Sequence, residues 1–378
     1  MKVLCLNKIS PVGLKALPSS YTLTEDINEA DAILVRSANM LETSLPEKVL
    51  AVGRAGAGVN NIPLEMYAKS GVVVFNTPGA NANAVKELTI AGMLLAARDI
   101  RGSMEWVQNN KNDELINKSM EKAKGAFAGT EILGKTLGII GCGAIGALVA
   151  QAAGALGMHV LGVEPSEATI ERNKHLFPAD MEIVSADEMY ARADYISIHV
   201  PLMDATKGMI NKDVFAKCKD GVIFVNCARD AIVNDDDMKV ALESGKVRRY
   251  VTDFPNYKTA NMNGVVAISH LGASTEEAED NCAAMAAKQI VDYVENGNII
   301  NSVNFPRIDL GKKEGTRVVV LFEGDKAEEV SRQLLGASKI ASGMKGNFGA
   351  LVAEVKSIDE NALKTIPGVL RVRIINNI

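Results

Sequence analysis

The stretch KTLGIIGCGAIGALVAQAAGALGMHVLGVEP, residues 135–165, decides how the rest of the sequence is interpreted. A short apolar run ends at Gly141, and the spacing Gly141-x-Gly143-x-x-Gly146 opens an alanine-rich segment. A second apolar run ends at Glu164. Glycines at these three places permit a tight turn, close approach of the backbone to a pyrophosphate, and close packing of a helix on a strand. The stretch therefore predicts a strand–helix–strand unit that binds a dinucleotide.

The same stretch indicates which dinucleotide is bound. A helix that begins at Ala144 and Ile145 presents backbone N–H donors and a positive end to the phosphates. Glu164 follows at the spacing expected of a carboxylate that hydrogen-bonds the ribose 2′-hydroxyl, and its charge would repel the 2′-phosphate of NADP. We therefore expect NAD. A glycine-rich turn without a ligand, and an exposed strand-end charge at Glu164, are the alternatives that the residues leave open.

Short apolar runs rich in β-branched residues recur along the chain and alternate with longer segments of helical character. Such runs are typical of parallel strands buried on both faces, and ligands of such sheets bind beyond the carboxyl ends of the strands. We expect an α/β fold whose strands end within the runs 33–38, 52–58, 72–79, 137–143, 160–165, 195–201, 222–229, 250–254 and 266–272. A helix after residue 81 is expected to share one apolar face among Val85, Leu88, Ala91 and Leu95.

Length, charge and cysteine content limit the class of protein. A chain of 378 residues is long enough for two or three domains, and a net charge of −5 gives no reason to expect a nucleic-acid or membrane partner. The five cysteines are scattered and never in CxxC spacing, which argues against a disulfide framework or a zinc site. The apolar run at the N-terminus is too short for a signal peptide and is expected to form a first strand. We therefore expect a cytoplasmic protein without a metal.

Two of the predicted strands end in residues suited to redox chemistry on a small acid. Arg229 follows the strand in VNCARDAIV, where a guanidinium can bind a carboxylate with two hydrogen bonds. His270 follows the strand in VAISHLGAST, where an imidazole can transfer a proton if a carboxylate orients it. With a nicotinamide cofactor, these two side chains suffice to reduce a 2-keto acid. The alternatives are a helix-capping Arg229 and a core His270, and His199 in SIHVPL is expected to be structural.

Six motifs follow one another in an order that resembles the D-isomer-specific 2-hydroxyacid dehydrogenases: GRAGAGVNNI, NTPGANANAVKEL, GKTLGIIGCGAIG, HVPL, VNCAR and HLGAST. The resemblance implies two Rossmann-like domains with doubly wound parallel sheets. Residues 1–100, completed by 283–306, are expected to form the substrate-binding domain, and residues 101–282 the NAD-binding domain. After a linker at 307–316, the tail 317–378 has a βαββαβ-like order, typical of a small α+β, ferredoxin-like module, and resembles an ACT regulatory domain.

The resemblance also implies roles for single residues. Arg229 binds and polarises the substrate, His270 is the acid or base, and Asp253 lies near the nicotinamide. Arg54 and Lys86 are expected to meet a phosphate, although a solvated helix lysine is an equal alternative for Lys86. Further substrate contacts are expected from Gly56, Ala57 and Gly58. Beyond the glycine loop and Glu164, NAD contacts are expected from Val200, Pro201, Cys227, Ala228 and Asp253.

One departure from the family pattern concerns the acid or base. The family has a glutamate about five residues after the Asp253 equivalent, and that glutamate hydrogen-bonds the histidine. Here DFPNYK places Tyr257 or Lys258 at this position. Either another group orients His270, with Asp253, the Tyr257 hydroxyl and an acid from elsewhere in the fold as candidates, or catalysis has been lost and the chain binds NAD as a sensor.

Two further departures concern the substrate and the tail. Asp230 stands where the family usually has glycine after Arg229, and its charge would compete with a substrate carboxylate unless the side chain turns away. The tail reads FEGDKAEEV after its first strand and lacks the turn and asparagine of a serine-binding ACT domain. Feedback by serine is therefore not expected, and the module is expected to serve assembly.

The implied activity is the reversible, NAD-dependent oxidation of D-3-phosphoglycerate to 3-phosphohydroxypyruvate, which feeds serine synthesis. A hydroxypyruvate or glyoxylate reductase, which needs no phosphate site, is the alternative within the family. An NADH-sensing interaction protein with weak catalysis is the alternative of another class. The resemblance implies a small-molecule substrate and a homodimer built through the NAD-binding domain, or a homotetramer if the tail adds a second interface.

Overall fold

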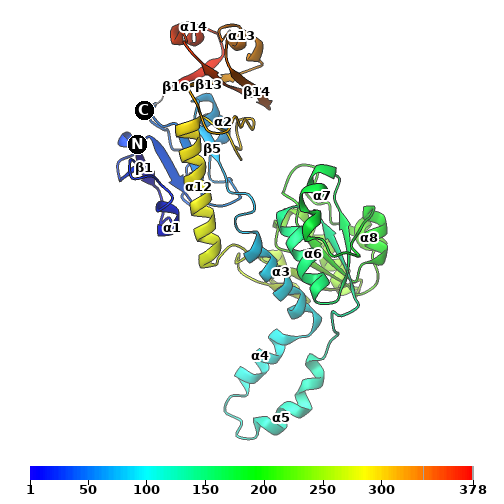
Figure 1. Ribbon diagram of the computed structural model, residues 1–378. Coiled ribbons are helices and arrows are strands. Elements are labelled where there is room, and N and C mark those ends of the chain that lie inside the picture. The colour runs from blue at the N-terminus through cyan, green and yellow to red at the C-terminus, as the bar shows by residue number, and fades with distance from the viewer. Residues whose placement is uncertain (335, 377–378) are drawn as a thin grey trace. The chain divides into compact units, whose positions relative to one another are not determined.

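The computed structural model describes residues 1–334 and 336–376, which fold into two compact units. One unit comprises residues 82–275, and the other comprises residues 1–81 together with the chain from residue 276 onward (Figure 1). Among the described residues, no helix is both long and apolar enough to cross a bilayer.

The unit 82–275 is built on a seven-stranded sheet in the order β12-β11-β10-β9-β6-β7-β8. All of its strand pairs are parallel. The strands are β6 (Thr136–Ile140), β7 (His159–Val163), β8 (Glu182–Ile183), β9 (Tyr195–Ile198), β10 (Val222–Asn226), β11 (Val247–Thr252) and β12 (Val265–Ala267). The chain starts at the central β6, runs outward to β8, then crosses to β9 and runs outward to β12. This doubly wound order is that of a Rossmann fold and confirms the predicted α/β class.

Helices cover both faces of this sheet because its central strands are apolar on both sides. The cluster on one face includes side chains of α3 (Ala82–Ala97) and α6 (Ala144–Ala155). The cluster on the other face includes side chains of α8 (Ala186–Arg192), α9 (Lys212–Lys217) and α10 (Asp235–Glu243). Further helices of this unit are α7 (Glu167–Asn173), α11 (Tyr257–Ala260), η3 (Lys174–Leu176) and η4 (Asp230–Ile232).

The buried face of α3 differs from the predicted one. Ala91 is exposed, and Leu88 and Leu95 are only partly buried. The face that packs inward instead contains Val85, Thr89, Gly92, Met93 and Ala96. A Cβ on Gly92 would lie 2.8 Å from a methyl of Val251, so the missing side chain lets the helix approach β11 closely. Small residues, rather than the largest apolar ones, therefore define this interface.

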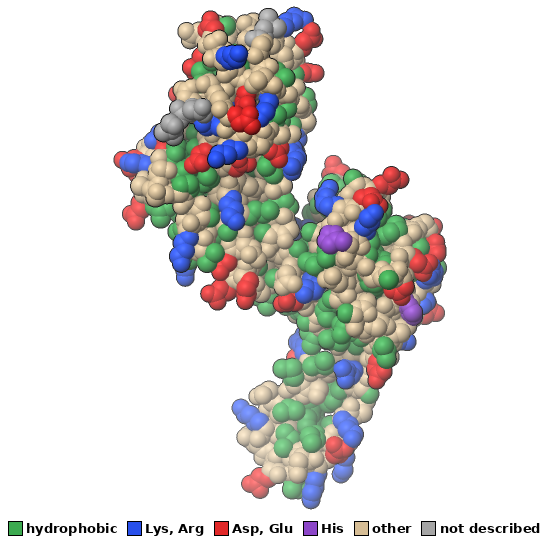
Figure 2. All heavy atoms as spheres, in the orientation of Figure 1, with side chains coloured by type: hydrophobic (Ala, Val, Ile, Leu, Met, Phe, Trp, Pro, Cys, Tyr) green, Lys and Arg blue, Asp and Glu red, His purple; other side chains and the backbone are tan. Residues whose placement is uncertain are grey.

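Residues 100–127 form an arm that the sequence did not predict. The arm consists of α4 (Ile100–Asn109), α5 (Ile116–Ala123) and η2 (Lys124–Phe127), and none of these elements contains a buried residue. Both longer helices are amphipathic, yet their apolar side chains are exposed, among them Met104, Val107, Leu115 and Met120. Figure 2 shows hydrophobic side chains on the surface of the arm.

The other unit begins with a five-stranded parallel sheet in the order β2-β1-β3-β4-β5. Its elements are β1 (Lys2–Cys5), α1 (Pro11–Leu14), β2 (Thr22–Thr24), η1 (Ile27–Glu29), β3 (Ala32–Val35), β4 (Ala51–Arg54), α2 (Leu64–Lys69) and β5 (Val73–Phe75). The long helix α12 (Glu276–Asn296) returns to this sheet and packs on β4. A Cβ on Gly53 would lie 2.9 Å from Ile290, so this glycine permits the close contact of helix and strand.

The C-terminal part of this unit is a four-stranded antiparallel sheet in the order β14-β15-β13-β16. Its elements are β13 (Thr316–Glu323), α13 (Ala327–Arg332), β14 (Lys339–Lys345), β15 (Phe348–Val355), α14 (Glu360–Lys364) and β16 (Val369–Ile375). The succession βαββαβ with this strand order is ferredoxin-like. It confirms the predicted small α+β module, which is consistent with an ACT-like domain.

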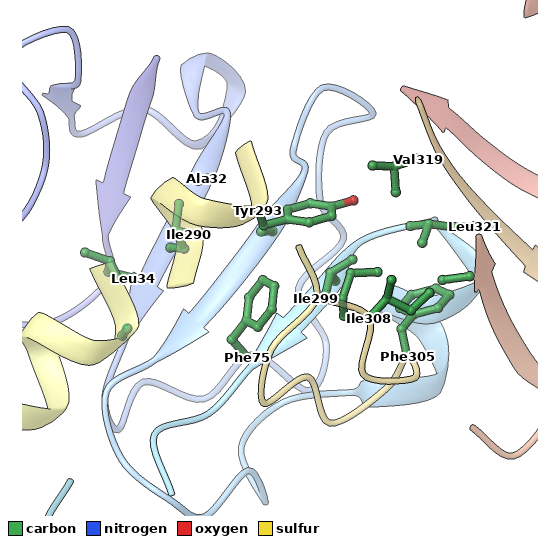
Figure 3. Packing of buried hydrophobic residues seen from close by; sticks show 14 of the residues in the cluster. Ala32, Leu34, Phe75, Ile290, Tyr293, Ile299, Phe305, Ile308, Val319 and Leu321 are labelled. Carbon is green, nitrogen blue, oxygen red and sulfur yellow. The ribbon is translucent and has the colours of Figure 1, made fainter. Parts of the chain in front are cut away.

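The C-terminal sheet shares a hydrophobic core with the first sheet. Figure 3 shows Phe75 and Tyr293 facing Ile299 and Phe305, with Val319 and Leu321 of β13 beside them. The segment predicted as a linker takes part in this core, since Ile308 is buried and pairs with Ile299 in an isolated β-bridge.

A buried ion pair joins two neighbouring strands of the same sheet. The Arg317 side chain is completely buried and pairs with Glu354 of the neighbouring strand β15. The Arg317 guanidinium also donates to the carbonyl oxygens of Asn296 and Gly311, both at 2.7 Å. Since Asn296 ends α12, this arginine joins the C-terminal sheet to the helix that completes the first sheet.

Candidate active site

The three glycines of the nucleotide loop each meet a different geometric demand. Gly141 has φ of +90°, a backbone conformation that residues with a side chain rarely adopt. A Cβ on Gly146 would lie 2.0 Å from the carbonyl oxygen of Gly141, so α6 can approach β6 only without a side chain there. A Cβ on Gly143 would meet no protein atom within 4 Å. The open space at Gly143, beside the N-terminus of α6, is where a pyrophosphate fits.

Glu164 stands at the end of β7 and is braced by backbone amides. Its carboxylate accepts hydrogen bonds from the N–H groups of Cys142 and Ser166, each at 3.0 Å. Each oxygen keeps a second lone pair, so the carboxylate is held next to the glycine loop and can still accept from ribose hydroxyls. The donor set and the glycine cradle both fit NAD.

The two cysteines near the nucleotide site are buried thiols. Burial raises the pKa of the Cys142 thiol, and also that of the Cys227 thiol, to about 12. Both groups are therefore protonated at neutral pH, and neither is a nucleophile or an oxidation-prone thiolate.

The HVPL turn follows β9 beside the glycine loop. His199 is partly buried, its Nε2 lies 2.8 Å from the Ser197 hydroxyl, and desolvation lowers its pKa to about 4. The imidazole is therefore neutral at physiological pH, which agrees with the structural role expected for it. A Cβ on Gly141 would lie 2.9 Å from a methyl of Val200, so this turn contacts the glycine loop, whereas Pro201 is exposed.

Arg229 follows β10 and is partly buried. The buried side chain of Asn226 fixes the backbone at Arg229, because the Asn226 Oδ1 accepts hydrogen bonds from the N–H groups of Ala228 and Arg229. The Asn226 amide nitrogen donates to the Arg229 carbonyl at 2.8 Å. We did not expect this brace, although the asparagine stands inside the VNCAR motif. Asp230 is exposed, and within the described chain no ion pair joins it to Arg229.

Asp253 ends β11 and holds the histidine loop. Its side chain is 1% exposed, and Oδ2 accepts from the Gly272 N–H at 2.9 Å, two residues after His270. Burial raises the pKa of Asp253 above its usual value, against the opposing effects of this hydrogen bond and of the His270 charge. The other oxygen, Oδ1, is buried without a hydrogen-bond partner. An amide N–H donor such as the nicotinamide carboxamide fits this acceptor.

The group that orients His270 is not one of the residues at the missing glutamate's position. Tyr257 is 88% exposed at the start of α11. Lys258 pairs with Asp236 at 2.7 Å. In residues 1–334 and 336–376, no carboxylate forms a hydrogen bond with His270, which is itself exposed. Its ring contacts that of Phe254, with centroids 4.3 Å apart.

The proposed substrate loop lies in the other unit, after β4. Gly56 has φ of +145°, and a Cβ there would overlap the Arg54 guanidinium, which covers the glycine. Within the part of the chain that the structure describes, the amides of Ala57 and Gly58 donate no hydrogen bond to the protein. The Asn76 side chain donates to the Ala57 carbonyl at 2.7 Å and shapes the loop. Two available amides suit a carboxylate.

The structure thus places the predicted residues in three groups. The glycine loop, Glu164 and the HVPL turn lie together, and Arg229, Asp253 and His270 lie together, both groups in the unit 82–275. The loop from Arg54 to Gly58 belongs to the other unit. Lys86 lies in the second turn of α3, with its ammonium 3.6 Å from the Glu87 carboxylate. No group of residues suited to a metal ion occurs in the described chain.

Comparisons with known proteins agree with this geometry. Residues 90–272 match the family described as D-isomer specific 2-hydroxyacid dehydrogenase, NAD binding domain. The chain is 32% identical over 408 residues to D-3-phosphoglycerate dehydrogenase of Mycobacterium bovis, and the match covers 97% of this chain and 74% of that protein.

Two solved structures share the fold. The NAD+-bound 3-phosphoglycerate dehydrogenase of Entamoeba histolytica is 26% identical with a TM-score of 0.62, covering 80% of this chain and 98% of that one. A glyoxylate reductase from Paecilomyes thermophila is 25% identical with a TM-score of 0.64 and the same coverage.

Proposed function

Because the chain belongs to the D-isomer specific 2-hydroxyacid dehydrogenase family, we propose that it is an NAD-dependent dehydrogenase that oxidises D-3-phosphoglycerate to 3-phosphohydroxypyruvate. The observation that carries the proposal is the similarity to D-3-phosphoglycerate dehydrogenase over 97% of the chain. The supporting geometry is the placement of Arg229 and His270 beyond strands of the sheet whose β6 carries the glycine loop.

The side chains divide the reaction between them. Arg229 binds the substrate carboxylate and polarises the oxygen at C2 with its guanidinium. In the oxidation, the His270 imidazole takes the hydroxyl proton while C2 loses a hydride, and a C=O bond forms. Bound NAD supplies the acceptor for that hydride. Asp253 holds the loop that carries His270 and offers its buried Oδ1 to the carboxamide.

The substrate's two anionic ends require separate partners. The amides of Ala57 and Gly58 suit the carboxylate, and the cations Arg54 and Lys86 suit the phosphate. These assignments, and the domain boundaries at residues 100, 283 and 307, are part of the proposal. Arg54 already covers Gly56, so a phosphate bound there would lie next to the same loop.

The proposal includes a homodimer in the cytoplasm. The apolar face of the α4–α5 arm has no partner within the described chain, and Met104 and Leu115 are 64% and 57% exposed. A second copy of the same arm would bury this face, since soluble proteins rarely expose large apolar patches. A tetramer would need a further interface from the C-terminal sheet.

The test is a comparison of substrates. Purified protein is assayed for NADH consumption with phosphohydroxypyruvate, hydroxypyruvate, glyoxylate and pyruvate in parallel. We expect the phosphorylated acid to have the highest kcat/KM. Arg54→Ala and Lys86→Ala are each expected to raise KM for the phosphorylated acid about tenfold, with a smaller effect on hydroxypyruvate. Unchanged KM in both variants would contradict the phosphate assignment.

One observation favours a second candidate. The fold similarity to a glyoxylate reductase, at a TM-score of 0.64, matches that to the phosphoglycerate enzyme. A hydroxypyruvate or glyoxylate reductase needs the same Arg229 and His270 but no phosphate site. Higher kcat/KM with glyoxylate or hydroxypyruvate than with the phosphorylated acid would select this candidate. NADH binding without turnover on any acid would instead select the NADH-sensing alternative.

A further inference from the structure

Within residues 1–334 and 336–376 no carboxylate forms a hydrogen bond with His270, yet Asp253 holds the histidine loop through the Gly272 N–H. An imidazole that transfers a proton must present one ring nitrogen to the substrate, and a displacement of about 1 Å can lower a rate about 100-fold. The contacts that fix the ring are therefore part of the catalytic arrangement. In the described chain the ring of Phe254 contacts the imidazole.

Phe254 contacts both side chains on which the proposed reaction depends. Its ring centroid lies 4.3 Å from that of the His270 ring, with 42° between the two planes. The Arg229 guanidinium carbon lies 5.2 Å from the same Phe254 centroid. Aromatic faces attract both an imidazole ring and a guanidinium at such distances. One benzene ring thus connects the carboxylate-binding group to the proton-transfer group.

Phe254 can serve this purpose because its own backbone is fixed on both sides. Its N–H donates to the hydroxyl of the buried Thr252 at 3.0 Å. Asp253, directly before it, holds the Gly272 amide of the histidine loop. Two residues later, Asn256 caps α11 and donates to the Asp235 carboxylate at 2.7 Å. The ring therefore belongs to a rigid corner between β11 and α11.

We propose that Phe254 positions His270 and Arg229 through its ring face and takes over the orienting task of the family's missing glutamate. The inference rests on the proposed dehydrogenase function and deepens it. Phe254 itself exchanges no proton and is a positioning residue. Its substitution is therefore expected to impair turnover and substrate binding while leaving the nucleotide loop, which follows β6, three strands away from β11, unaffected.

Three variants test this role. Phe254→Leu keeps an apolar side chain but removes the ring face, and we expect kcat to fall at least about tenfold and KM for the keto acid to rise. Phe254→Tyr keeps the ring face and is expected to retain kcat within about threefold of the unmodified chain. The control is Phe215→Leu, which breaks an aromatic pair with Phe224 in the core of the same unit. It is expected to lower the unfolding temperature and leave kcat unchanged.

NADH affinity separates positioning from general damage. The dissociation constant for NADH is expected to remain within about twofold of the unmodified value in both Phe254 variants, because neither touches the glycine loop. If Phe254→Leu retains kcat within twofold, or if Phe254→Tyr is as impaired as Phe254→Leu, the ring face does not position His270 and the proposal is overturned.

A spectroscopic measurement keeps the inference independent of turnover. The chain contains four histidines, so isotope-labelled imidazoles give few signals, and His270→Gln identifies the one that belongs to His270. We expect ring-current-shifted His270 resonances that persist in Phe254→Tyr and lose the shift in Phe254→Leu. If the shift is present but no acid turns over, the proposed function fails while the contact stands. If the shift is absent from the unmodified chain, the inference fails whatever the activity.

Discussion

The glycine loop after β6 and the histidine loop after β12 lie on strands of one parallel sheet, but they are specified in different ways. The glycine loop depends on backbone geometry, with Gly141 at positive φ and Gly146 against a carbonyl oxygen. The histidine loop is exposed and depends on side chains, since Asp253 holds its backbone and Phe254 contacts its imidazole. We therefore expect the glycine loop to tolerate few substitutions, whereas residues of different types can orient the acid or base.

We expect His270→Gln to separate the function of the histidine loop most clearly from that of the glycine loop. Removing the proton-transfer group is expected to lower kcat by about 10²–10⁴-fold, the usual contribution of a general acid or base. The glycine loop is untouched, so NADH should bind with unchanged affinity. Steady-state kinetics and NADH fluorescence titration of the same sample measure both quantities. A parallel loss of NADH affinity would show that the histidine loop and the glycine loop are not independent.

Two glycine substitutions are expected to impair the glycine loop in different ways. Gly146→Ala places a Cβ 2.0 Å from the Gly141 carbonyl oxygen, so the helix must move, at a cost of about 1–3 kcal/mol in folding free energy. Gly143→Ala meets no protein atom and is expected to leave the unfolding temperature unchanged while weakening NAD binding about tenfold or more. Thermal unfolding without and with NAD distinguishes the two. Equal destabilisation of the apo protein by both variants would contradict the separate roles.

Glu164→Gln tests the contact of this side chain with the ribose, and it also removes one of the two hydrogen bonds from the Cys142 and Ser166 N–H groups, because an amide NH2 cannot accept. The neutral amide keeps one acceptor but loses the charge-assisted hydrogen bonds to the ribose, so the dissociation constant for NAD should rise about tenfold. The repulsion of a 2′-phosphate also disappears, and the preference for NAD over NADP should narrow. Parallel titrations with both nucleotides provide the measurement, and an unchanged ratio of affinities would argue against contact with the ribose.

Asp253→Asn is expected to have the smallest effect on folding. It should keep or slightly raise the stability at pH 7 and lower kcat. Burial raises the folded-state pKa of Asp253 above its ordinary 3.8, so the folded protein binds the proton more tightly than the unfolded chain. The stability from this protonation is complete below about pH 4 and is lost as the pH rises through the folded pKa.

The Asp253→Asn side chain does not ionise, so this variant does not lose that stability as the pH rises. Its unfolding midpoint at pH 7 should therefore equal or exceed that of the unmodified chain by up to about 3 °C, the shift produced by about 1 kcal/mol. The difference should vanish in acid, and kcat should fall. A variant clearly less stable at pH 7 would show that the buried charge is stabilised in the folded state.

Much of the fold could be predicted because backbone and burial leave direct traces in the sequence. The glycine spacing around Gly141 and the apolar runs of the central strands required no tertiary information. The exposed arm at residues 100–127 was missed, since its apolar positions have no core of the same unit to face. The buried face of α3 was assigned to large side chains, whereas Gly92 sets the contact with β11.

The site was predictable where it rests on motifs and not where it rests on contacts between them. Arg229 and His270 followed from their places after apolar strands. The Asn226 brace lies inside the VNCAR motif, but its side-chain hydrogen bonds to residues 228 and 229 are a local geometry that residue type alone does not reveal. The Phe254 ring contacts Arg229 and His270, which are distant in sequence and belong to other motifs. The same holds for Arg317, a charged residue inside a strand pattern that proves completely buried because Glu354 pairs with it.

The central claim is that this chain combines an intact nucleotide loop with a working acid or base. The most direct measurement follows NADH binding and phosphohydroxypyruvate-dependent NADH oxidation in one sample of the unmodified protein. We predict saturable binding together with turnover that requires the phosphorylated keto acid. Binding without turnover on any 2-keto acid would contradict the account, because Arg229, His270 and Phe254 would then be assembled without catalysing the reaction.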